Sequence, residues 1–188
     1  PNGEMTSIDS KSLNGVGGSF LTVQVDEGRV FAREQFSEEH KMFAKAAVEF
    51  GESRIKPNRE ALNVLNKSLS LEIFKEMGEL GFLAIDVPED YEGLGLDKTT
   101  ACLVVESLSS GRNASILVTM SAHTGIALLP IIWYGSEKQK KKYLPKMGSG
   151  EWMGAYALTE PGAGSDALSG KMTAELNESG SHYILNGT

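Results

Sequence analysis

Apolar residues recur at helical spacing over most of the chain and change to alternation near its carboxy-terminal end. Residues 43–50 place apolar side chains three or four positions apart after Ser37, a good N-cap residue. This pattern predicts a first helix that Pro57 ends. Ser70 is the predicted N-cap of a second helix, and Gly81 lies just past its end.

Two more helices are predicted after a loop at residues 87–96, whose glycines and proline prevent regular structure. Asp97 is the predicted cap of the first of them. The second begins near Ser115 and is predicted to kink near Pro130. Its apolar stretch at 114–134 has about the length of a membrane span. Because polar residues, a glycine and a proline interrupt that stretch, we expect a buried helix of a soluble protein.

The last predicted helix is short and basic. Ser136 and Gln139 have the form of a capping box, and Pro145 is expected to end the helix. The helix carries the one dense cationic run, Lys138–Lys142, which is typical of a solvated helix face. With 18 basic and 25 acidic side chains, the net charge of the chain is −7. An acidic balance argues against a nucleic-acid partner.

From residue 152 the pattern becomes that of short strands. Residues 152–158 are an apolar strand candidate, and residues 159–164 form a polar, glycine-rich turn. Residues 171–176 and 182–185 alternate like two further strands. Three short strands cannot bury both faces of a sheet, so we expect the sequence to be a fragment. The predicted fold class is α+β, with an amino-terminal helical bundle that leads into a β-sheet domain.

The amino-terminal region and the single cysteine give weaker signals. Residues 1–18 are expected to be a flexible arm without the apolar core of a secretory signal, and Phe20–Phe31 alternates weakly like a strand. Cys102 lies in an apolar stretch, so we expect it to be buried, and a lone cysteine fits a reducing compartment. The predicted division of the chain is an extension (1–35), a helical domain (36–150) and the beginning of a β domain (151–188).

The segment Tyr156–Ala167 carries the strongest chemical signal. Gly162 and Gly164 let the backbone turn sharply and approach a ligand closely, and successive N–H groups in such a turn can hold an anion. Thr159 and Ser165 add hydroxyls that bond carbonyl or phosphate oxygens. The loop therefore has the chemistry to hold a polar heterocycle or a pyrophosphate. Residues 162–167 also match the dinucleotide pattern G-x-G-x-x-A, but the alternation that follows argues against the helix which that pattern requires.

Read as a whole, this segment resembles the flavin and substrate loop of the acyl-CoA dehydrogenase family, with its pattern of an aromatic residue, two residues and Thr-Glu-Pro-Gly-x-Gly-Ser-Asp. Tyr134–Pro145 is similar to the family's G-x-x-x-Q-K-x-x-Y-L helix. Val87–Gly95 resembles its P-E-x-Y-G-G-x-G loop, except that Glu92 stands where many members have glycine. Phe36–Glu39 resembles the opening of the first helix. The resemblance covers about residues 36–188.

The resemblance implies an FAD-dependent enzyme that oxidises an acyl-CoA thioester to the trans-2-enoyl-CoA in fatty-acid β-oxidation. Its implied partners are the acyl-CoA substrate, an electron-transfer flavoprotein as acceptor, and further copies of itself in a homodimer or homotetramer. The catalytic glutamate of the family lies far downstream, in a further carboxy-terminal helical bundle. We therefore expect no catalytic residue in this chain, neither Glu160 nor Asp166, and no metal site.

The resemblance also implies site residues. Thr159 would face the flavin ring, and Ser165 would touch both FAD and the CoA thioester. The implied cofactor-binding residues are Tyr156, Ala157, Leu158, Thr159, Gly164 and Ser165. The implied substrate-binding residues are Ser165, Thr119, Ser121 and Ala122.

Small side chains at Ser121 and Ala122 would leave a deep acyl pocket. The segments Gly17–Leu21 and Thr119–His123 resemble the long-form, very-long-chain branch of the family, and a long-chain substrate is expected. Ordinary packing of small residues is the alternative for the helix, and His123 is expected to be a packing histidine. For the whole protein, the alternatives are an acyl-CoA oxidase that uses oxygen and a helical interaction module without catalysis. The expected compartment is the cytoplasm of a bacterium or the mitochondrial matrix of a eukaryote.

Overall fold

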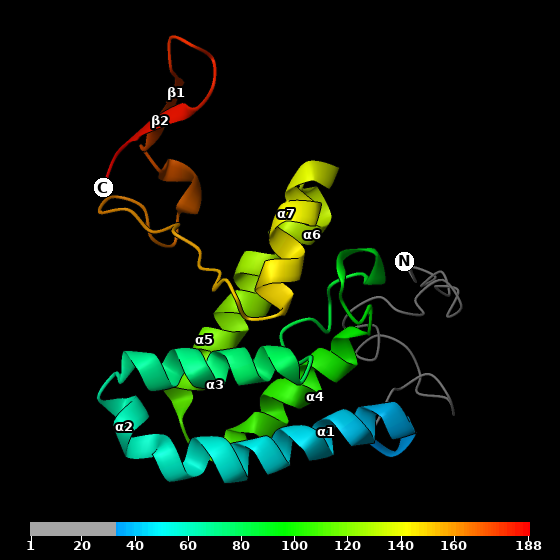
Figure 1. Cartoon of the computed structure of the whole chain (residues 1–188). Helices are drawn as coiled ribbons and strands as arrows, with labels where there is room; N and C mark the ends of the chain where they lie inside the picture. Colours follow the sequence, from blue (N-terminus) through cyan, green and yellow to red (C-terminus); the bar gives the residue numbers. More distant parts are fainter. Residues whose placement is uncertain (1–32) are drawn as a thin grey trace, which may run out of the picture.

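A computed structural model describes residues 33–188, so the expectations for residues 1–18 and 20–31 lie outside the described residues. Helices α1 to α5 and the helix pair α6–α7 precede a two-stranded sheet (Figure 1). The α-helices are α1 (Glu38–Phe50), α2 (Arg59–Asn63), α3 (Lys67–Glu79), α4 (Lys98–Leu108), α5 (Ala114–Ser121), α6 (Leu129–Tyr134) and α7 (Glu137–Gly148). The strands are β1 (Thr173–Leu176) and β2 (Tyr183–Asn186).

The predicted caps at Ser37 and Asp97 are confirmed, and one histidine joins them. The Ser37 hydroxyl accepts the N–H of His40, and the His40 Nδ1 accepts the N–H of Ser37, so histidine completes the capping box. Because Nδ1 accepts, the proton is on Nε2, which lies 3.1 Å from the Asp97 carboxylate. Asp97 caps α4 by accepting the N–H of Thr100, and this bond holds the pKa of Asp97 below its usual value.

The predicted end of the first helix and the predicted start of the second are wrong. Pro57 does not end the helical path, because α1 continues through a π-helix (Gly51–Ile55) and a 3₁₀-helix (Lys56–Asn58) into α2. Pro57 lies in the first turn of that 3₁₀-helix, where its missing N–H costs no hydrogen bond. Asn66, not Ser70, caps α3, because its side-chain oxygen accepts the N–H of Leu69.

The carboxy-terminal ends of the predicted helices also differ in part from expectation. Gly81 follows α3 with φ of +78°, as a helix-ending glycine requires, and this prediction is confirmed. The Ser136–Gln139 capping box of α7 is confirmed as well. Pro145, however, lies inside α7, which ends only at Gly148. Proline removes one backbone hydrogen bond of the helix. Because Pro145 lies in the last turn, close to the end of α7 at Gly148, the helix tolerates this loss.

The long apolar helix consists of three parts. Asn113 caps α5, a π-helix follows at Ala122–Leu128, and α6 completes the helix. The departure from α geometry thus lies before Pro130 rather than at it. Length and composition alone would let Ala114–Tyr134 cross a membrane. Ile116, Met120, His123, Ala127 and Leu128 of this helix are buried, whereas Val118, Ile126, Trp133 and Tyr134 are exposed.

The buried residues form two clusters, and the long helix contributes to both. The first lies among α1, α3, α4 and the start of α5, where Ile116 and Met120 pack. The second lies beneath α7, where Ala127 and Leu128 meet Leu144. Cys102 is exposed, which contradicts the expected burial, because α4 turns Leu103 and Val104 into the core instead.

Strands β1 and β2 pair in antiparallel fashion, with Thr173 opposite Asn186, as the alternation predicts. Figure 1 shows this hairpin standing clear of the helices. The expected strand at 152–158 is absent from the sheet that residues 33–188 form. The N–H of Trp152 instead bonds the carbonyl of Lys146 and belongs to the end of α7.

Candidate functional site

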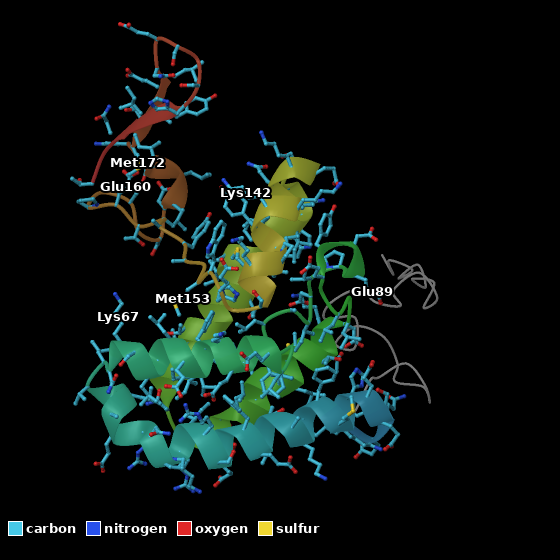
Figure 2. All side chains as sticks on the ribbon, in the orientation of Figure 1. Lys67, Glu89, Lys142, Met153, Glu160 and Met172 are labelled. Carbon is cyan, nitrogen blue, oxygen red and sulfur yellow. The ribbon has the colours of Figure 1, made fainter. Side chains whose placement is uncertain are left out.

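The loop between the helices and the hairpin is closed on itself. Glu160 and Ala163 exchange two backbone hydrogen bonds of 3.0 and 3.1 Å, and the Ala163 side chain is buried. The Glu160 carboxylate accepts the backbone N–H groups of Lys171 at 2.6 Å and of Met172 at 3.0 Å. Figure 2 shows Glu160 beside Met172, from opposite ends of this loop. Glu160 therefore holds both ends of segment 160–172 together.

These hydrogen bonds also define the charge state of Glu160. The N–H groups of Lys171 and Met172 stabilise the carboxylate and hold the pKa of Glu160 below its usual value. A carboxylate whose two oxygens already accept backbone protons is a poor proton acceptor. The geometry thus gives Glu160 a structural role in closing the loop.

The outer face of the loop is open. Residues 156–159, Gly164 and Ser165 are exposed, and a Cβ added at Gly162 or Gly164 would meet no atom within 4 Å. Neither glycine has a positive φ, so the turn does not depend on a left-handed backbone at either position. The glycines leave space beside the backbone instead. Exposed hydroxyls at Thr159 and Ser165 border that space, which fits a polar heterocycle or a phosphate lying along the loop.

The predicted substrate residues lie beside two grooves of the helical part. Thr119 lines a groove of about 320 Å³ between α3 and α5, together with Leu71 and Met153. Ser121 lines another groove, of about 410 Å³, with Cys102 of α4 on its opposite wall. Ala122 is half-buried on the same turn as Ser121. Neither of these two grooves is lined by a residue of segment 156–165.

A histidine connects the helices to the start of the candidate flavin segment. His123 is fully buried, as expected for a packing histidine. Its ring and the ring of Phe74 are in contact edge to face. Its Nδ1 accepts the N–H of Gly154 at 2.9 Å, and its Nε2 lies 3.1 Å from the Met147 carbonyl oxygen. Burial lowers the pKa of His123 from 6.5 to about 4. The sequence showed the residue type but not these partners, which lie 24 and 31 positions away.

Glu92 lies in the loop at residues 87–96, at an unusual backbone conformation. Its backbone is left-handed, with φ of +63°, a conformation that glycine adopts without cost and other residues adopt at about 1 kcal/mol or more. This is the position at which many proteins with the resembling loop have glycine. Glycine would therefore suit this backbone conformation better than glutamate does.

Residues 37–151 match the model of the acyl-CoA dehydrogenase N-terminal domain. The chain belongs to the acyl-CoA dehydrogenase family. A crystal structure of an acyl-CoA dehydrogenase complexed with FAD, from Bacillus anthracis, has 50% identity and a TM-score of 0.86. The match covers 91% of this acyl-CoA dehydrogenase chain and 29% of the chain in that structure.

Two curated relatives extend the comparison. A probable acyl-CoA dehydrogenase of Bacillus subtilis is 48% identical over 171 residues, which make up 91% of this chain and 28% of the relative. The mitochondrial isovaleryl-CoA dehydrogenase of Solanum tuberosum is 37% identical, over 81% of this chain and 36% of the relative. The chain thus spans roughly a third of the length of the relatives it matches, and corresponds to the amino-terminal part of the family's fold.

Proposed function

We propose that the protein containing this chain oxidises an acyl-CoA thioester to the trans-2-enoyl-CoA with FAD as cofactor. The observation that carries the proposal is the closed loop at Glu160 with its open outer face, within a chain of the acyl-CoA dehydrogenase family. A relative of 50% identity whose structure contains FAD supports the choice of cofactor. Bound FAD supplies the acceptor for the hydride that leaves Cβ.

The residues of this chain bind and orient in that reaction. The segment Tyr156–Ser165 is assigned to the flavin: the aromatic and apolar side chains of Tyr156 and Leu158 are exposed for contact with a ring. The hydroxyl groups of Thr159 and Ser165 can donate to carbonyl or phosphate oxygens, and Ser165 is assigned to the CoA thioester as well. Ala157 and Gly164 provide backbone without bulk. The base that removes the α-proton is assigned to a residue downstream of Thr188.

The acyl group is assigned to the helix that carries Thr119, Ser121 and Ala122. We propose a long acyl chain, because side chains this small leave depth beside the helix. The name of the isovaleryl-CoA relative points to small acyl groups in another member, so chain length needs its own test. Ala122→Phe should lower kcat/KM for long acyl-CoAs more than for short ones. Ala114→Phe, at the exposed start of α5, is the control. Equal losses for both substrates would contradict the pocket role.

The main experiment uses the purified full-length protein. A flavin absorbance spectrum, and its bleaching when an acyl-CoA is added without oxygen, are the expected results. Absence of flavin would favour a non-catalytic helical interaction module. Turnover that requires oxygen and yields hydrogen peroxide would identify an oxidase.

We further propose an electron-transfer flavoprotein as acceptor, a homodimer or homotetramer as the assembly, and the bacterial cytoplasm or mitochondrial matrix as the compartment.

A further inference from the structure

The buried His123 makes two hydrogen bonds that fix its protonation. The N–H of Gly154 can only donate, so Nδ1 of the ring must accept and carries no proton. The proton is therefore on Nε2, which donates to the carbonyl oxygen of Met147. The ring is a neutral, fully buried bridge with a defined direction, a donor at one end and an acceptor at the other.

The bridge connects parts of the chain that the proposed function uses separately. Met147 lies in the last turn of α7, and Gly154 lies two residues before Tyr156, where the segment assigned to the flavin begins. On the long helix, Thr119 lies four residues before His123 and thus on the same face. Met153, next to Gly154, lines the groove of Thr119. The helix face that carries Thr119 and His123 therefore contacts both the groove of Thr119 and the entry to the flavin segment.

The fit around this contact excludes a side chain at Gly154. A Cβ added there would lie 2.4 Å from the Met147 Cε and 2.6 Å from the Ala127 Cβ. The glycine lets the backbone come close enough for its N–H to reach the ring of His123. The π-helix at Ala122–Leu128 begins beside the same histidine, and such segments are frequent at functional sites.

We propose that His123 is a positioning residue, whose Nδ1 holds the entry of the flavin segment in register with the helix assigned to the acyl group. This assignment rests on the proposed function. His123 lies outside the reacting atoms and acts through the backbone at Gly154. Loss of the acceptor at Nδ1 frees this end of the flavin segment, whereas loss of the donor at Nε2 affects only the end of α7.

Two substitutions separate the two ends of the ring. In His123→Asn, the amide oxygen lies near the position of Nδ1 and can accept from Gly154. In His123→Gln, the amide nitrogen reaches the position of Nε2 and can donate to Met147. Each variant loses one hydrogen bond and part of the ring, so both should lose similar thermal stability. His182→Asn and His182→Gln, at an exposed histidine of the hairpin, are the matched controls.

The decisive measurement is the dissociation constant for FAD of the full-length protein, titrated by flavin fluorescence. We expect about tenfold weaker binding for His123→Gln, the ratio that one hydrogen bond supplies, and less than about threefold for His123→Asn. The controls should match the wild type. Equal weakening in the Asn and Gln variants would show a packing role only and overturn the proposal. A wild-type protein that binds no flavin would refute the proposed function instead.

A measurement on the wild type keeps the proposal testable if both variants fail to fold. The N–H of Gly154 should exchange slowly with solvent deuterium in the flavin-free protein, because it is bonded to a buried acceptor. Exchange of this amide as fast as that of exposed loop amides would mean that the bond to His123 is not formed. That result would overturn the assignment whatever the variants do.

Discussion

Acidification should remove stability that His123 provides as a neutral group. Its pKa is about 4 in the folded protein and 6.5 when unperturbed, chiefly because burial disfavours the charged ring. A depressed folded pKa means that the unfolded chain binds the proton more readily. The contribution is therefore fully present above pH 6.5 and is lost as the pH falls toward 4. The gap between the two pKa values corresponds to about 3 kcal/mol, of which about 2 kcal/mol should be lost by pH 4.5.

The assay compares urea unfolding of the wild type and His123→Gln at pH 7.0 and pH 4.5, which are chosen to bracket most of that window. The ring contacts Phe74, Met147 and Gly154, and none of these titrates there. Other titrating groups are present in both proteins and cancel in the difference. We expect the stability advantage of the wild type to shrink by about 2 kcal/mol at the lower pH. An advantage that stays the same at both pH values would refute the reasoning that His123 is buried in its neutral form.

Three further predictions concern other contacts. Glu160→Ala should speed amide exchange at Lys171 and Met172 and weaken FAD binding, as measured by deuterium exchange and flavin titration; unchanged exchange would contradict the loop closure. Asp97→Ala should cost about 1–2 kcal/mol in urea unfolding because it removes a helix cap, and a loss near zero would contradict that role. Gly154→Ala should lower the free energy of unfolding by about 1–3 kcal/mol through overpacking. An unchanged melting temperature would contradict the close fit at Gly154.

Features that depend on neighbouring residues were predictable from the sequence. The caps at Ser37, Asp97 and Ser136 involve partners three residues away, and all three are confirmed. Ser70 was a wrong choice because Asn66, four residues earlier, is also a good cap, and local propensity cannot rank two adequate caps. The hairpin was found because alternation and the turn at Asn177–Gly180 agree.

Features that depend on distant partners were not predictable. A strand at 152–158 needs a neighbouring strand, and the first residue of the stretch bonds α7 instead. Burial of Cys102 depends on which side of α4 meets the core, and its apolar neighbours left that side undetermined. The candidate site follows the same rule. The open loop at Gly162 and Gly164 was expected from its composition, whereas the partners of Glu160 and His123 come only from the folded chain.

The π-helix at Ala122–Leu128 lies between the parts of the long helix that pack in the two buried clusters. Met120, before it, packs in the first cluster, and Leu128, at its end, packs in the second. A π segment holds one residue more than α geometry would need for the same path, and each residue of an α-helix turns the chain by about 100°. A single-residue deletion inside this segment would restore α geometry and leave the two halves in register, whereas a deletion in the flanking α5 or α6 would rotate the halves against each other by about that angle. After a deletion in the flanking helices, Met120 or Leu128 would face solvent, so the π segment is the one stretch of this long helix that should accept the loss of a residue.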